Sequence, residues 1–235
     1  MEEIQNNETD ASRTHARAMR GETATGDLRI HPFHSRIYRN DRFLRVLVPP
    51  GYDDADNAAY QYPVLYLNDG QNLFEPATSF NGVEWQVDET ADRLIRQQVI
   101  PPMIIVGIDN AGKDRVREYM PHRSFQPMML RVQGTRYPSF LTKEVIPFVE
   151  RHYRVASGPR NTGLGGSSLG ALIALYGHGF TWDRRPLAVG ESLVVGRQSP
   201  DHAAESHSPA LAGKNLPSHR QRRGRTTRSG PQHGR

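Results

Sequence analysis

Two short, uninterrupted apolar runs, each closed at once by a turn sequence, are the strongest constraint on the fold of this chain. Residues 63–67 run into Asn-Asp-Gly, and residues 103–108 run into Asp-Asn-Ala-Gly. Strands buried on both faces have this appearance, because no polar residue alternates with the apolar ones. Helical apolar spacing at 84–99 and 137–153 separates these strands from each other and from a short segment at 161–165. We therefore predict an α/β fold, with a mostly parallel sheet flanked by helices and right-handed crossovers.

Further elements follow from local pattern. Alternating apolar and polar residues at 36–40 and 42–48 predict two strands joined at residues 40–41. Pro147 lies inside the second helical pattern and predicts a kink or a break into two pieces. The apolar stretch 171–176 predicts a helix after the third short segment.

The two ends of the chain differ in composition from its middle. Residues 1–26 are polar and lack periodicity, which predicts a disordered N-terminal segment before a folded core over 27–177. The last 30 residues hold seven basic side chains and no acidic one, whereas the rest of the chain has a net charge of −2. The basic character therefore belongs to the tail, and we predict that residues 178–235 are a disordered basic tail in which only 187–195 has the pattern of a strand.

Several functional classes are excluded or disfavoured. The chain has no cysteine, which excludes disulfides, thiolate zinc sites and cysteine nucleophiles. No apolar run approaches the roughly 20 residues that span a bilayer, and the first 26 residues lack the apolar core of a signal peptide, so we expect a cytoplasmic protein without membrane attachment. His31 and His34 are close in sequence, but two histidines without a third ligand are typical of a surface. We predict no metal and no cofactor.

A glycine-flanked serine at 166–170 carries the chemistry. The sequence Gly-Ser-Ser-Leu-Gly matches G-x-S-x-G with Ser168 at its centre, between a predicted strand and a predicted helix. A nucleophilic serine needs such a tight turn, and the helix that follows aims free N–H groups at developing negative charge. The alternative is an ordinary connecting turn, which the strand and helix on either side disfavour. Nucleotide-binding patterns fail, because they require glycine at position 168 or a lysine in this turn.

The stretch from about residue 43 to 176 resembles the esterase-D-like branch of the α/β-hydrolases, relatives of enterochelin and feruloyl esterases. The matching pieces, in the family's order, are RVLVPPGY at 45–52, YPVLYLNDGQNLF at 62–74, IIVGID at 104–109, REYMP at 117–121, PFVE at 147–150 and GGSSLG at 165–170. The resemblance implies an α/β-hydrolase fold and a serine hydrolase of esterase type that acts on a small-molecule ester through an acyl-enzyme.

The same resemblance implies roles for individual residues. Ser168 is the nucleophile, and the backbone N–H groups of Leu169 and Gln71 form the oxyanion hole. Arg117, Glu118 and Tyr119 are expected near the rim of the cleft, although as isolated residues they favour a structural role.

The acid and the histidine of the triad are expected after the nucleophile, as in other α/β-hydrolases. The acids there are Asp183, Glu191, Asp201 and Glu205, and the histidines are His178, His202, His207, His219 and His233. None follows a convincing strand, so we expect a sheet that is incomplete at its C-terminal end.

Three hypotheses therefore stay open: an active esterase, an inactive truncated or frameshifted remnant of one, and a nucleic-acid-binding tail at 219–228. The tail's five arginines attract phosphate, but it has no aromatic residues to stack on bases. We therefore favour a solvated tail over nucleic-acid binding.

Overall fold

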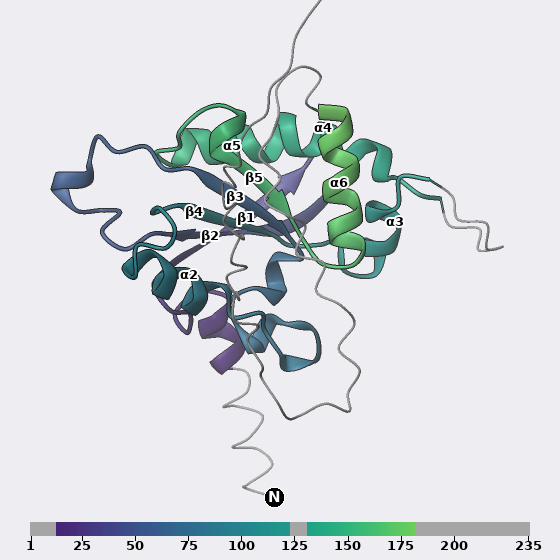
Figure 1. Cartoon of the computed structure of the whole chain (residues 1–235). Helices are drawn as coiled ribbons and strands as arrows, with labels where there is room; N and C mark the ends of the chain where they lie inside the picture. The colour runs from purple at the N-terminus through teal and green to yellow at the C-terminus, as the bar shows by residue number, and fades with distance from the viewer. Residues whose placement is uncertain (1–12, 123–130, 182–235) are drawn as a thin grey trace, which may run out of the picture. The chain divides into compact units, whose positions relative to one another are not determined.

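A five-stranded mixed sheet lies at the centre of the residues that the computed structural model describes, 13–122 and 131–181 (Figure 1). The strands are β1 (Asp27–Ser35), β2 (Asn40–Val48), β3 (Val64–Asn68), β4 (Ile104–Ile108) and β5 (Thr162–Gly165), in the spatial order β1-β2-β4-β3-β5. Only β2 runs against the other four of these strands. The predicted α/β fold with a mostly parallel sheet is confirmed.

Helices cover both faces of this sheet (Figure 1). One face carries α2 (Val87–Arg96), and the other carries α4 (Tyr137–Phe140), α5 (Ile146–His152) and α6 (Leu169–Thr181). The short helix α3 (Arg115–Tyr119) follows β4. Within residues 13–122 and 131–181, no helix combines the length and the apolar character of a membrane-spanning segment.

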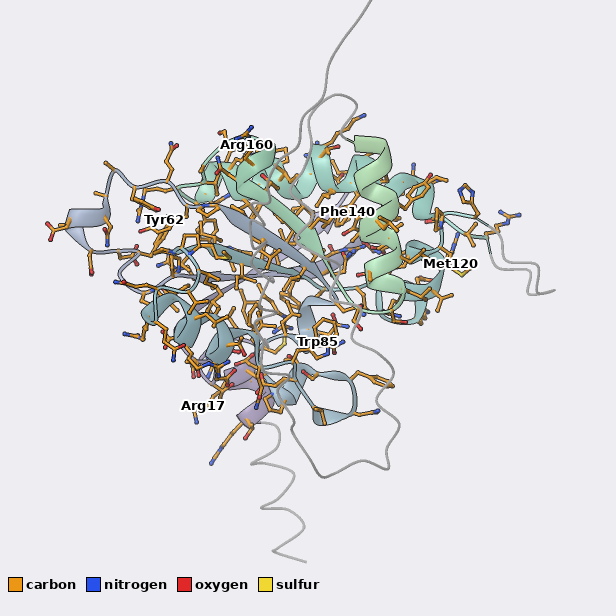
Figure 2. All side chains as sticks on the ribbon, in the orientation of Figure 1. Arg17, Tyr62, Trp85, Met120, Phe140 and Arg160 are labelled. Carbon is orange, nitrogen blue, oxygen red and sulfur yellow. The ribbon has the colours of Figure 1, made fainter. Side chains whose placement is uncertain are left out.

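The two faces bury separate hydrophobic cores, and successive residues of a strand alternate between them. Val46 and Val106 pack with the residues of α4, α5 and α6, whereas Leu47 and Ile105 pack on the side of α2. This burial on both faces is the reason that β4 has a continuous apolar sequence. Side chains fill the space between the sheet and both helical layers, including Phe140 of α4 (Figure 2).

The hairpin at the start of the sheet differs from its prediction. The first strand is β1, and residues 36–39 form the turn, where Arg39 has a φ of 57°. The predicted strand at 36–40 is therefore wrong. The Glu144 carboxylate accepts hydrogen bonds from the backbone N–H groups of residues 36 and 37, both at 3.0 Å, and from Ser35 Oγ at 2.7 Å. The distant Glu144 side chain thus accepts the backbone hydrogen bonds that a neighbouring strand would otherwise accept.

The helical segment around Pro147 is interrupted, as predicted. A π-helical turn, η7 (Leu141–Val145), lies between α4 and α5. Proline has no N–H to donate to the preceding turn, and the wider turn accommodates this missing bond.

Residues 13–26 differ from the disorder expected for 1–26. Residues 13–18 are helical, Ala18 is fully buried, and the N–H of Thr25 donates to Asp88 Oδ2 of α2 at 2.7 Å. The segment is ordered because it packs on the side of α2, which local composition does not reveal. The predicted strand at 187–195 and the basic tail after residue 181 lie outside the described residues.

Candidate active site

Ser168 lies on the turn that joins β5 to α6, and its backbone is left-handed, with a φ of 54°. The residue is exposed, and two backbone hydrogen bonds close the turn, from Gly170 N to Ser167 O at 2.8 Å and from Leu172 N to Ser168 O at 3.1 Å. A left-handed conformation costs a serine about 1–2 kcal/mol. Such strain is concentrated at functional sites, where it holds a side chain in an exposed position.

Neither glycine of the motif has room for a side chain. A Cβ added at Gly166 would lie 2.7 Å from the carbonyl carbon of Gly170. A Cβ added at Gly170 would lie 2.9 Å from Oδ2 of Asp69, the residue that follows β3. Their missing side chains therefore let the turn close on itself and pack against the end of β3.

Both predicted oxyanion donors lie at the carboxyl ends of neighbouring parallel strands. β3 and β5 pair in parallel, with Leu67 opposite Gly165. Leu169 begins α6, and Gln71 lies in the 3-10 turn η2 (Gly70–Asn72) that follows β3. Within residues 13–122 and 131–181, neither N–H donates a hydrogen bond. Both groups are therefore free to bind an oxyanion, as the first N–H groups of a helix are.

Two buried side chains hold these loops together, and sequence reasoning did not single them out. Asn68 Nδ2 donates to the carbonyl of Gly170 at 2.8 Å, and the hydroxyl of Tyr137 donates to Asn68 Oδ1. Asn68 and Tyr137 are fully buried, and burial raises the pKa of Tyr137, so this hydroxyl remains a donor. In the sequence Asn68 is simply the first residue of an Asn-Asp-Gly turn, which gives no signal for this role.

The segment expected at the rim of the cleft is largely structural. Glu118 is buried and forms a two-point ion pair with Arg42, at 2.6 and 2.9 Å. Tyr119 is fully buried, and its hydroxyl accepts a hydrogen bond from the N–H of Asp69 at 3.4 Å. These contacts agree with the structural role that Glu118 and Tyr119 favour as isolated residues.

The side chains of all candidate triad acids and histidines lie outside those that the structure describes. Ser168 Oγ has no hydrogen-bond partner among the described residues, which include the turn at Ser168 and the N–H groups of Leu169 and Gln71 but no side chain of a candidate acid or histidine. The nucleophilic role of Ser168 and the oxyanion-binding roles of Leu169 and Gln71 therefore stay predictions.

Comparison with known proteins identifies the family of this chain. The sequence profile of the family described as "Putative esterase" matches residues 35–180. A curated relative, the uncharacterized protein YbbA of Bacillus subtilis, is 29% identical over 141 residues, and the match covers 58% of this chain and 50% of that protein. This chain thus spans half the length of that relative.

Solved structures show the same fold. An IroE-like serine hydrolase from Shewanella oneidensis is 26% identical, with a TM-score of 0.50 over 65% of this chain and 46% of the other. The enterobactin esterase FES from Shigella flexneri is 20% identical, with a TM-score of 0.52 over 70% of this chain and 37% of the other. The family profile covers more than half of the sequence, and the chain therefore belongs to this esterase family of the α/β-hydrolase fold.

Proposed function

We propose that this chain is a serine esterase that hydrolyses small-molecule carboxylic esters through an acyl-enzyme on Ser168. The observation that carries the proposal is the exposed Ser168, held in a left-handed conformation after β5. Leu169 and Gln71, whose N–H groups have no acceptors among the described residues, follow β5 and the neighbouring parallel strand β3. Membership of an esterase family and likeness to a structure described as a serine hydrolase support it.

The reaction proceeds in two halves. Ser168 Oγ attacks the ester carbonyl carbon while its proton passes to a general base, and the carbonyl oxygen becomes an oxyanion held by the N–H groups of Leu169 and Gln71. The C–O bond to the alcohol breaks, and the alcohol leaves with that proton. Water then attacks the acyl-enzyme in the same way, which releases the carboxylic acid and restores the serine.

The general base and its orienting acid are sought after residue 168, because the chain order of the α/β-hydrolases puts them there. A histidine within reach of Ser168 Oγ is the requirement, since serine is a weak nucleophile without one. The five histidines named above are the candidates.

Labelling with a fluorophosphonate tests the nucleophile directly. The full-length chain should form a covalent adduct on the peptide that contains Ser168, and it should hydrolyse p-nitrophenyl butyrate. Ser168→Ala should lose both activities. Ser167→Ala is the matched control, because only the backbone carbonyl of Ser167 takes part in the turn.

Two outcomes would contradict the proposal. Labelling that persists in Ser168→Ala would place the nucleophile elsewhere. Absence of labelling in a folded, soluble sample would make the chain an inactive member of its family, and circular dichroism on the same sample establishes that it is folded.

A further inference from the structure

Three carboxylates converge where α2 begins, on the face of the sheet opposite to α6. Glu84, Asp88 and Glu89 each bring one oxygen to within 4.8 Å of the other two. Asp88 is completely buried, and the two glutamates are partly buried. Among the described residues, none of the three forms a salt bridge. This cluster of like charge is separate from the candidate active site, and the proposal below does not rest on the proposed function.

Three buried oxygen atoms in this cluster have no hydrogen-bond donor among the described residues: Asp88 Oδ1, Glu84 Oε2 and Glu89 Oε2. The other oxygen of Asp88 accepts from the N–H of Thr25. A buried polar atom that lacks a partner costs about 1–3 kcal/mol, and more when it is charged. Native structures contain few such atoms, and a bound ion is one of the ways in which they are satisfied.

The position at a helix N-terminus does not account for the cluster. The helix dipole favours negative charge there by about 0.3–1 kcal/mol for an exposed group, which is less than the cost of a buried charge without a partner. Burial is the main cause that raises the pKa of Asp88 and of Glu84. A hydrogen bond with Glu89, and then the charge of Glu89, raise the pKa of Asp88 further, and the charge of Glu89 also raises the pKa of Glu84. Arg45 pairs with Asp109 and Glu75, and Arg96 pairs with Asp92, so neither arginine forms a salt bridge with the cluster.

We propose that Glu84, Asp88 and Glu89 bind a hard divalent cation, with Ca²⁺ as the preferred ion. All three ligands are carboxylates, which suit Ca²⁺, Mg²⁺ and Mn²⁺. Two oxygens that share a Ca²⁺ ion lie up to about 5 Å apart, because each Ca–O distance is about 2.3–2.6 Å, so the spacing of these oxygens is compatible with Ca²⁺. Ca²⁺ also accepts irregular coordination, whereas Mg²⁺ demands a near-ideal octahedron. Water completes the coordination.

The surroundings of Asp88 give a bound cation a role in stability. Asp88 also lines a cavity of about 270 Å³ between α2 and the loop that follows β2. Because Asp88 also accepts the hydrogen bond from Thr25, a bound cation would join residues 13–26 to α2 and stabilise the fold. Trp85, which is 38% exposed, is the neighbour of Glu84 and can report on a bound lanthanide (Figure 2).

Thermal unfolding of the EDTA-treated full-length chain tests the site. Addition of CaCl₂ should raise the Tm in a saturable way, by about 5–10 °C at a hundredfold excess over Kd, with a smaller rise for MgCl₂. Tb³⁺ should give luminescence excited through tryptophan, and Ca²⁺ should compete it away. Trp85→Phe should weaken that luminescence and leave the Ca²⁺-dependent rise in Tm unchanged.

Substitutions locate the cation. Asp88→Asn and Glu89→Gln should abolish the response to Ca²⁺. Asp88→Asn should also raise the Tm in EDTA, because it removes a buried charge, and this separates loss of binding from misfolding. Asp92→Asn, one turn later on α2 and paired with Arg96, is the matched control and should keep the full response. No response to Ca²⁺, Mg²⁺ or Mn²⁺ in the unaltered chain, or an equal response in Asp88→Asn, would overturn the proposal.

Discussion

Arg115 forms a bidentate salt bridge with the carboxylate of Asp69, with Nε 2.6 Å from Oδ1 and Nη2 2.7 Å from Oδ2. Asp69 is buried, has a left-handed backbone with a φ of 61°, and directly precedes the turn that presents Gln71. Asn110 Nδ2 donates to the same Oδ1 at 2.7 Å. This ion pair therefore fixes the loop that carries one of the proposed oxyanion donors, and Asp69 in turn raises the pKa of Arg115.

Loss of Arg115 should affect both stability and reactivity. Arg115→Gln leaves the buried Asp69 charge with Asn110 as its side-chain partner, and we expect a loss of about 3 kcal/mol of unfolding free energy, at the low end for a broken buried pair because Arg115 is partly exposed. The loop that carries the Gln71 N–H should also move. Because this N–H is one of the proposed oxyanion donors, fluorophosphonate labelling of Ser168 should slow by about 10–100-fold. Urea unfolding and labelling rates measure the two effects.

A second substitution and a control sharpen this prediction. Adding Asp69→Asn to Arg115→Gln removes the uncompensated charge and should recover part of the lost stability. Arg96→Gln breaks an exposed pair with Asp92 and should have little effect on stability, because solvent screens such a pair. Equal losses from Arg115→Gln and Arg96→Gln would contradict the role assigned to Asp69 and Arg115.

Because the backbone of Ser168 is left-handed and that of Ser167 is not, replacing serine with glycine rather than alanine should have opposite effects on stability at these two positions. Ser168→Gly should be more stable than Ser168→Ala by about 1 kcal/mol, because glycine adopts positive φ without a steric cost. Ser167 does not have a positive φ, so Ser167→Gly should be less stable than Ser167→Ala. Chemical denaturation of the four variants measures both differences, and a stabilisation of the same sign at both serines would contradict the strain at Ser168.

The glycines of β5 and its turn should differ in their tolerance of a methyl group. Gly166→Ala brings a Cβ to 2.7 Å from backbone atoms of Gly170, which cannot move without opening the turn. We expect a cost of about 1–3 kcal/mol and much slower labelling of Ser168. At Gly163 the new Cβ meets a terminal methyl of Leu65 at 2.9 Å, and that flexible side chain can shift. Gly163→Ala is therefore the control and should retain most of the labelling rate.

The parts of the structure that sequence predicted are those set by local pattern. The apolar runs of β3 and β4, the interruption near Pro147 and the glycine-flanked turn at Ser168 each depend on neighbours in the chain. The failures depend on distant residues. Glu144 stabilises the turn at residues 36–39 although it lies more than 100 positions away in the sequence. Arg115 forms an ion pair with Asp69, and nothing in the Asn-Asp-Gly sequence indicates this partner. Likewise, Glu84, Asp88 and Glu89 resemble a solvated helix start until packing buries Asp88.

His31 should make stability sensitive to acid. Its Nε2 lies 2.5 Å from the hydroxyl of Tyr153, and burial raises the pKa of Tyr153 to about 12, so the tyrosine donates and a neutral His31 accepts. Burial, followed by the charges of His152 and Arg29, lowers the pKa of His31. Below the ordinary histidine pKa of 6.5 the unfolded chain therefore takes up the proton more readily than the folded one, and this contribution to stability is lost as the pH falls towards the lowered pKa.

Substitution of His31 should remove this contribution. In urea unfolding across the range from about pH 7.5 to 5, His31→Gln should lose less stability than the unaltered chain, although it should be less stable at the upper end because its ring contact with Phe148 is gone. A His31→Gln variant that loses stability as steeply as the unaltered chain would show that other groups cause the acid sensitivity, because the proton uptake that distinguishes the two states at His31 would then be too small to measure.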